Sequence, residues 1–234
     1  MMEKNNNYIQ KIYSKRSIER VDRKIKLLGV NNKLSTVLFL NIRLVASLTI
    51  FSLLIIFVKK GYLYAPIITL IYYYGLEYIQ LDSKIKKRAS KLDYEALLFF
   101  EVLSLSITTG RDLKAALEQT IANIDSGISD EFKYVIKEMN YGKSMSEAIN
   151  NAKLRIPSDT INNVLLNISQ TSTFGTNIVD TLNTQVDYLR EKKLLEVRSS
   201  IAKMPIKISI VSVLFFVPLI LLMILSPLII NFFN

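Results

Sequence analysis

Hydrophobic residues gather in three long runs, and the stretch between the second and third runs mixes apolar and polar residues instead. The runs cover residues 37–58, 62–79 and 205–233. Each is close to the roughly 20 residues that a helix needs to cross the hydrocarbon core of a bilayer. A basic turn of only three residues separates the first two runs. The pattern predicts a transmembrane hairpin at residues 37–80 and a transmembrane helix at residues 205–234.

Few polar residues interrupt these runs. Arg43 lies near the start of the first run, where its long side chain can snorkel to the headgroups. Glu77 lies near the end of the second run, and we expect it at a solvated helix end rather than as a functional acid inside the membrane. Pro218 and Pro227 lie in the third run, which predicts a tilt or a proline kink in that helix.

The segment between the hairpin and the last helix, residues 81–204, has amphipathic helical periodicity and no long apolar run. We expect about six helices there, packed as a compact antiparallel bundle. Residues 1–36 are polar and basic, and they form an N-terminal arm. The predicted fold class is therefore an all-α integral membrane protein, with an N-terminal transmembrane hairpin, a helical bundle and a C-terminal transmembrane helix.

A short sequence motif appears three times within this bundle segment, beginning at Gly110, Gly142 and Gly175. The glycines stand 32 and 33 residues apart, and a short polar residue follows each glycine two positions on. Glycine tolerates the left-handed conformation that closes a helix, and the polar residue then caps the next helix. A period of this length with two helices per unit predicts stacked helical hairpins.

The predicted capping residues of these joints are Asp112, Ser144 and Asn177. Ser144 and Glu147 have the spacing of a capping box, in which each residue bonds the backbone of the other. We expect all of these residues, like the three glycines, to be structural.

Composition removes several classes of chemistry. The chain of 234 residues has no Cys and no His, which excludes disulfides, thiolate chemistry, the usual zinc sites and histidine acid/base catalysis. No phosphate-binding loop of the Walker type is present. Asp125, Asp130 and Glu131 surround a turn, and we expect solvated helix caps there rather than a cation site. We therefore predict that the protein is not an enzyme and that it binds no cofactor and no metal.

The distribution of positive charge predicts the orientation of the chain. The formal net charge is +10, with 9 Lys and Arg in residues 1–36, 17 in residues 81–204, and none after Lys207. Cytoplasmic flanks of membrane helices carry such an excess. The arm and the bundle are therefore predicted in the cytoplasm and the C-terminus across the membrane, and no nucleic-acid partner is needed to explain the charge.

Several sequence motifs together resemble those of a known family. They are GRDLKAAL at 110–117, YGKSMSEAI at 141–149, the Gly175 phrase leading into YLREKK at 188–193, and AKMPIK at 202–207 followed by Pro218 and Pro227. This combination resembles the F domain of the type II secretion system (GspF/PilC-like) family. Within that family it is more similar to the Tad (Flp) pilus branch, and to TadC rather than TadB. The main branches carry two tandem F domains, whereas this chain has room for one.

The resemblance implies a non-enzymatic scaffold of the bacterial inner membrane, in a type IV pilus or type II secretion assembly. Its implied partners are a cytoplasmic hexameric ATPase, a paralogous TadB-like platform protein, pilin subunits and the lipid bilayer, in a homo- or hetero-oligomer. Charged residues exposed on a rigid bundle suit contact with such a motor. The candidates for the ATPase-contact surface are Arg111, Lys114, Lys143, Arg190 and Lys193.

Two other classes of protein stay open at the level of sequence. A membrane-anchored helical-repeat adaptor fits the period of about 33 residues, although the aromatic and small-residue positions of tetratricopeptide repeats are missing. A transporter or channel subunit would need polar residues along its spans, and those present all lie near the ends.

Overall fold

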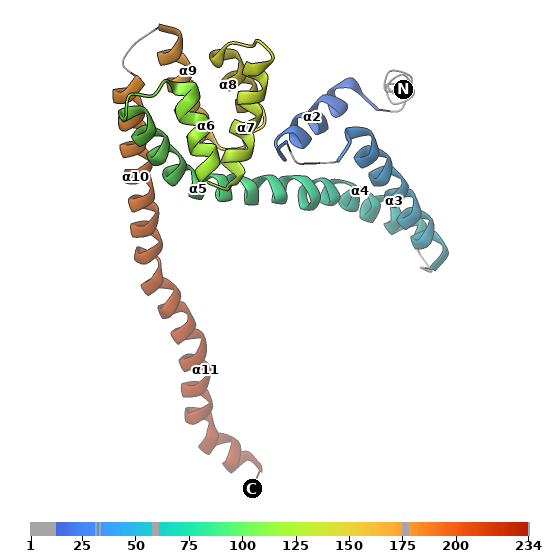
Figure 1. Cartoon of the computed structure of the whole chain (residues 1–234). Coiled ribbons are helices and arrows are strands. Elements are labelled where there is room, and N and C mark those ends of the chain that lie inside the picture. The colour runs from blue at the N-terminus through green and yellow to red at the C-terminus, as the bar shows by residue number, and fades with distance from the viewer. Residues whose placement is uncertain (1–12, 31, 33, 58–60, 175–177, 234) are drawn as a thin grey trace. The chain divides into compact units, whose positions relative to one another are not determined.

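The computed structural model describes residues 13–30, 32, 34–57, 61–174 and 178–233, and within these ranges every element is a helix (Figure 1). The prediction of an all-α fold is therefore confirmed. Two compact units make up the chain, Met1–Val186 and Asp187–Asn234. The helices of the first unit are α2 Lys15–Lys26, α3 Thr36–Phe57, α4 Gly61–Glu77, the π-helix η1 Tyr78–Asp82, α5 Ser83–Thr108, α6 Leu113–Asn123, α7 Gly127–Asn140, α8 Met145–Lys153 and α9 Asp159–Phe174.

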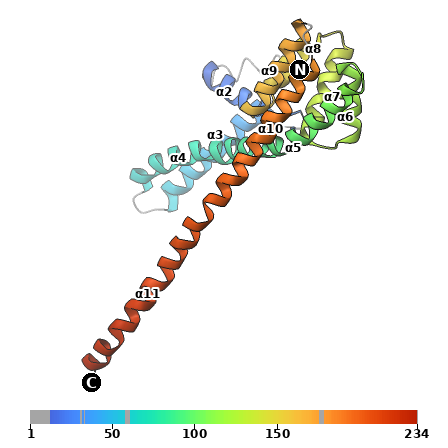
Figure 2. The same cartoon turned by 90° about the vertical axis from the view of Figure 1, so that its left-hand side faces the viewer.

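The apolar runs near the N-terminus form the helical pair α3 and α4, which pack side by side (Figures 1 and 2). Much of their outer surface is exposed and apolar, including Ile42, Leu48 and Ile71. An exposed apolar surface of this extent is typical of a site that contacts a membrane or other proteins.

The second helix of this pair continues into the bundle without a break. α4 ends at Glu77, η1 covers the next five residues and α5 begins at Ser83. Both views show one continuous run of helix from α4 into α5 (Figures 1 and 2). The bundle is therefore attached to the helical pair by continuous helix rather than by a flexible linker.

The core of the bundle is built around three phenylalanines. Phe99 of α5 stacks on Phe132 of α7 with ring centroids 4.8 Å apart, and Phe100 meets Phe132 edge to face at 6.2 Å. All three side chains are buried. Ile149 of α8 and Leu165 of α9 are also fully buried, so the amphipathic stripes seen in the sequence face one common core.

Residues 15–26, which the sequence indicated only as part of a basic arm, form the amphipathic helix α2. Val21 and Ile25 of α2 are buried in a cluster with Phe39, Leu40 and Leu81. The basic residues of α2 lie on its other side and are mostly exposed. This helix is therefore part of the packed first unit.

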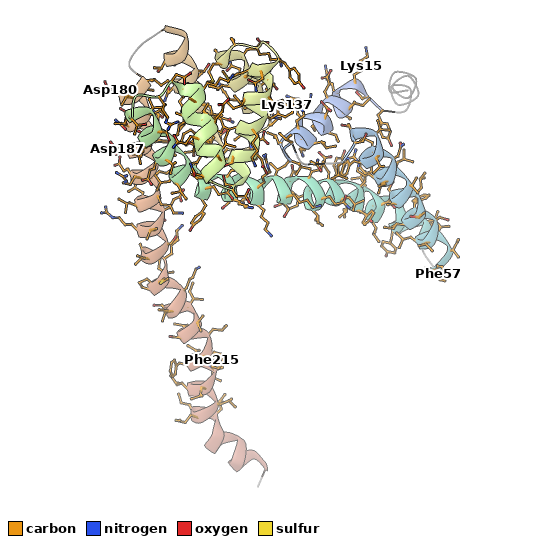
Figure 3. All side chains as sticks on the ribbon, viewed as in Figure 1. Lys15, Phe57, Lys137, Asp180, Asp187 and Phe215 are labelled. Atoms are coloured by element: carbon orange, nitrogen blue, oxygen red, sulfur yellow. The ribbon has the colours of Figure 1, made fainter. Side chains whose placement is uncertain are left out.

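Helix α10 covers Ile178–Ala202 and begins in the first unit, where Leu182 and Val186 are buried. The second unit holds the remainder of α10 and the apolar helix α11, Met204–Phe233. Side chains of α11 such as Phe215 project from the helix and are exposed (Figure 3).

Two helical stretches in the described part of the chain are long and apolar enough to cross a membrane: Thr36–Phe57 and Ile178–Leu225. The 18-residue apolar window is 22% buried in the first and unburied in the second. Helix α4 has only 17 residues and includes Pro66, so it lies at the lower limit of a spanning length. The three-span topology remains a prediction.

Candidate functional site

The first predicted joint links α5 to α6. Gly110 has φ +86°, and its N–H donates to the carbonyl of Ile107 at 2.9 Å. Asp112 is the N-cap residue of α6, and its Oδ1 accepts a hydrogen bond from Ala115 N at 3.1 Å. Nothing lies within 4 Å of a Cβ built on Gly110, so backbone conformation alone favours glycine there.

The second predicted joint links α7 to α8 and has the geometry of a Schellman motif. Gly142 has φ +94° and donates to Met139 O at 2.9 Å, while Lys143 N donates to Glu138 O at 3.2 Å. Ser144 caps α8 by accepting from Glu147 N at 3.2 Å. Gly175 and Asn177, which define the third predicted joint, lie outside the described residues.

The first two joints lie at one end of the bundle, because Lys114 Nζ donates to Asn140 Oδ1 at 2.8 Å (Figure 1). We call this end the joint surface, defined by residues 110–114 and 140–144. Arg111 is exposed there, and Tyr141 is 78% exposed. Sequence reasoning did not select Tyr141 as a contact residue, although it directly precedes the Gly142 turn.

The predicted contact residues have different environments. Lys143 forms an ion pair with Glu138 at 2.9 Å, so it holds the end of α7 as well as facing solvent. Arg190 lies in the second unit with Asp187 at 3.4 Å, and Lys193 also belongs to that unit. The first unit therefore brings Arg111, Lys114 and Lys143 together, while Arg190 and Lys193 belong to a separate part.

A buried ionic cluster is centred on Glu131, in the first half of α7. Its side chain is 2% exposed, and it pairs with Arg88 Nη2 at 2.7 Å and Arg155 Nε at 2.9 Å. The expectation of a solvated cap at Glu131 is wrong, because two guanidinium groups from α5 and the α8–α9 connection enclose it. A buried carboxylate needs such pairing to remain charged.

The same cluster attaches the turn after α2. Arg88 Nη1 donates to Leu27 O at 2.8 Å, and Val30 N donates to Glu131 Oε1 at 3.2 Å. Gly29 adopts φ +95°, and a Cβ built there would stand 2.5 Å from Arg88 Nη2. The backbone conformation therefore favours glycine, and so does the approach of Arg88, whose guanidinium is held by Leu27 O and Glu131. Burial lowers the pKa of Arg88, although the charge of Glu131 opposes this shift.

A neighbouring cluster surrounds Glu138. It accepts hydrogen bonds from Asn151 Nδ2 at 2.7 Å and Lys143 Nζ at 2.9 Å, and Arg155 Nη1 lies 3.6 Å away. Burial raises the pKa of Glu138, but these hydrogen bonds and positive charges outweigh it and leave the pKa below its usual value. Glu138 therefore stays ionised at neutral pH and joins α7 to α8.

A third ionic cluster lies where α2 meets the base of the helical pair. Lys24 Nζ lies 2.8 Å from both Glu77 Oε1 and Asp82 Oδ1, and Arg43 Nη1 lies 2.7 Å from Glu77 Oε2. Arg43 is 4% exposed and its guanidinium lies over the ring of Tyr73, 4.0 Å from the centroid. The interpretations of Arg43 as snorkelling and of Glu77 as solvated are wrong, because the two side chains pair with each other.

The π-helix explains how one lysine reaches two carboxylates. Ser83 N donates to Tyr78 O, which is the five-residue step of a π-turn. In an α-helix, residues five apart point about 140° away from each other. The wider π-turn brings Glu77 and Asp82 toward one face, so Lys24 bridges them. Hydrogen bonds to Asp82 and Glu77 outweigh the effect of burial and raise the pKa of Lys24.

The structure therefore assembles an ionic clamp, which we define as Lys24, Gly29, Arg88, Glu131 and the carboxylates Glu77 and Asp82. It joins α2 to the base of the helical pair and to the bundle at once. Sequence reasoning missed the clamp, since its members are separated by up to 107 positions and form no local motif. No three potential metal ligands come together among the described residues.

The described part of the chain thus combines a bundle of short capped helices with two helical stretches that are long and apolar enough to cross a membrane. The family model of the type II secretion system (T2SS) protein F matches residues 99–226, which is more than half of the chain. The protein therefore belongs to the type II secretion system protein F family. Its members are inner-membrane components of secretion and pilus systems and are generally non-enzymatic. No curated protein and no solved structure matches the chain significantly.

Proposed function

We propose that this chain is the inner-membrane platform of a Tad-like type IV pilus or a type II secretion assembly. It couples a cytoplasmic hexameric ATPase to the extraction and assembly of pilin subunits. Family membership supports a place in such a machine. The observation that carries the coupling role is the helical continuity of α4, η1 and α5, because it ties an apolar membrane segment to the bundle.

Continuous helix transmits displacement only if it cannot bend at the junction. The ionic clamp supports this requirement, since Lys24 bonds both sides of the π-helix and Arg88 bonds the turn after α2. A force on the bundle then moves α2, the helical pair and the bundle together. The clamp thus stiffens the segment that a motor would have to move.

The joint surface is the best candidate for the motor contact. Arg and Tyr residues dominate the binding energy of protein interfaces when they are exposed in the free protein and buried in the complex. Arg111 and the 78% exposed Tyr141 fit this description. Lys143 is a weaker candidate, because its ion pair with Glu138 serves the bundle itself. Arg190 and Lys193 remain candidates for a separate contact made by the second unit.

The remaining partners follow from the apolar surface. Exposed apolar residues along α3, α4 and α11 suit contact with lipid, with pilin transmembrane segments and with a paralogous TadB-like subunit or a second copy. The proposed orientation places the N-terminus and the bundle in the cytoplasm and the C-terminus outside the membrane. This assignment follows the excess of Lys and Arg in residues 1–36 and 81–204.

The test measures ATP turnover and complex formation of the organism's own secretion ATPase with the full-length protein in detergent. The full chain is required because residues 27–30 bond to Arg88 and Glu131. We expect Arg111→Glu and Tyr141→Ala each to weaken binding by about tenfold or more, as for interface hot spots.

Two control variants make the same kinds of substitution at exposed residues outside the joint surface. Lys133→Glu reverses an exposed cation in the middle of α7, two turns before the joint surface, and Tyr62→Ala removes a tyrosine that is 75% exposed at the start of α4. These variants should bind like the unaltered protein. No binding of the full-length protein would favour the membrane-anchored helical-repeat adaptor, and equal losses in test and control variants would remove the joint surface as the contact.

A further inference from the structure

A shallow, open hollow of about 920 Å³ lies along one face of η1 and the first half of α5. We call it the basic hollow. It begins one residue after the end of α4, so it lies directly beyond the apolar helical pair along the same continuous helix. Its lining residues are Tyr78, Asp82, Ser83, Lys86, Lys87, Ser90, Lys91 and Tyr94.

The lining carries uncompensated positive charge. Lys86 and Lys87 are exposed, and neither has a carboxylate within 4.0 Å among the described residues. Asp82, the only acid of the lining, already pairs with Lys24 at 2.8 Å, and Lys91 has a longer contact of 3.6 Å with Glu95. An anion entering the hollow would therefore meet two unpaired ammonium groups.

The other lining groups suit a phosphate at a membrane surface. Ser83 is exposed and offers a hydroxyl donor, and Tyr78, the residue after Glu77, is 67% exposed. Exposed tyrosines are enriched at the headgroup level of membranes, where the ring is apolar and the hydroxyl is hydrated. Ammonium and hydroxyl donors bind phosphate oxygens through charge-assisted hydrogen bonds.

The hollow also lies at the right depth. At about 1.5 Å per residue, Lys86 and Lys87 are roughly 13–15 Å beyond Glu77 along the helix axis. A headgroup layer extends about 5–7 Å beyond the hydrocarbon core, and charge attraction persists for about another 8 Å. Both lysines are therefore within electrostatic range of the lipid phosphates even for an upright helix, and any tilt brings them closer.

We propose that the basic hollow binds the headgroup of an anionic phospholipid, with Lys86 and Lys87 contacting its phosphate. Clusters of Lys and Arg immediately beyond a membrane helix bind anionic lipids in this way. The bound lipid fixes the depth of η1 and α5 at the bilayer surface, beside the ionic clamp. This inference requires membrane insertion but not an ATPase partner.

The test uses the full-length protein in a neutral detergent, with phosphatidylglycerol or phosphatidylcholine added, and native mass spectrometry to count retained lipids. We expect Lys86→Gln/Lys87→Gln to lower the affinity for phosphatidylglycerol by about tenfold or more. Lys86→Arg/Lys87→Arg should retain it, and so should the control Lys133→Gln/Lys137→Gln, which removes equal charge from α7. Circular dichroism of each variant checks that the fold is unchanged.

Three results would overturn the proposal. They are equal phosphatidylglycerol binding by the Lys86→Gln/Lys87→Gln variant and the control, equal retention of phosphatidylcholine and phosphatidylglycerol, and complete displacement of the lipid by equimolar inorganic phosphate. The last result would assign the hollow to a free phosphate compound. Because the ATPase is absent from this experiment, its outcome is independent of the proposed motor contact.

Discussion

Single residues decide how closely the segments of the first unit approach one another. Gly29 and Gly110 both adopt a positive φ, +95° and +86°. Only Gly29 also has a neighbour in the way, since a Cβ there would stand 2.5 Å from Arg88 Nη2, whereas the space beside Gly110 is open. The two glycines therefore separate the effect of backbone strain from the effect of steric conflict.

We expect Gly29→Ala to destabilise the protein more than Gly110→Ala. The left-handed conformation costs an alanine about 1–2 kcal/mol at either position. At position 29 the methyl group also displaces Arg88 from Leu27 O and Glu131, and weakening a buried ion pair adds to that cost. Thermal unfolding of the full-length variants, followed by circular dichroism, measures the difference. Equal shifts of the unfolding midpoint would contradict the close approach of Arg88.

The environment of a single residue also explains why the prediction of a solvated Glu131 was wrong. Sequence alone cannot distinguish a solvated carboxylate from Glu131, because the neighbours that bury it come from α5 and from the α8–α9 connection. Glu138, for which the sequence led to no prediction, also finds its partners beyond its own helix, at positions 143, 151 and 155. Ion pairs between helices join distant positions and leave no pattern in the local sequence, whereas capping residues stand at a fixed short spacing that the sequence shows.

At the scale of elements, the π-helix is the feature on which the clamp depends. It lets Lys24 of α2 reach Glu77 and Asp82 together. The raised pKa of Lys24 gives this bridge its pH dependence: its contribution to stability is complete below the unfolded pKa of about 10.4 and is lost as the pH rises through the higher folded pKa. The bridge is therefore constant throughout the physiological range.

We expect Lys24→Met to loosen α2 from the helical pair. Loss of hydrogen bonds to charged groups costs about 1.5–3 kcal/mol, which raises the population of undocked α2 by about tenfold or more. Trypsin cleavage at Arg20 and Arg23 measures that population in the folded protein. Lys26→Met is the matched control, since it removes one trypsin site from the same helix and only an exposed pair with Asp22. Equal cleavage rates in the two variants would count against the clamp.

At the scale of the whole molecule, the proposed function depends on how many times the chain crosses the membrane. Helices α3 and α11 contain the long apolar stretches, and α4 has 17 residues. The chain contains no native Cys, so single cysteines can be introduced without background labelling.

We expect Tyr62→Cys and Asn234→Cys to react with a membrane-impermeant maleimide on intact spheroplasts. Lys15→Cys and Lys137→Cys should react only after lysis, because the arm and the bundle are proposed to be cytoplasmic. Labelling is scored by the mass shift on a gel. Protection of Tyr62→Cys until lysis would show that α3 and α4 do not form a spanning hairpin, and protection of Asn234→Cys would place the C-terminus inside.

The sequence by itself determined the features that depend on neighbouring positions. The all-α class follows from helical periodicity, the apolar runs follow from composition, and the resemblance to F domains follows from short phrases that include Gly110 and Gly142. Each of these signals lies within a window of a few turns, where 3.6-residue periodicity and capping chemistry act.

Only the tertiary structure decided which distant charges meet. Arg43 pairs with Glu77, Lys24 bridges the π-helix, and Glu131 holds the turn around Gly29. The reason is physical: removing a charge from water is unfavourable unless an opposite charge is positioned beside it, and that position depends on how complete helices pack. Local sequence specifies each helix, while the packing of the helices creates the clamp.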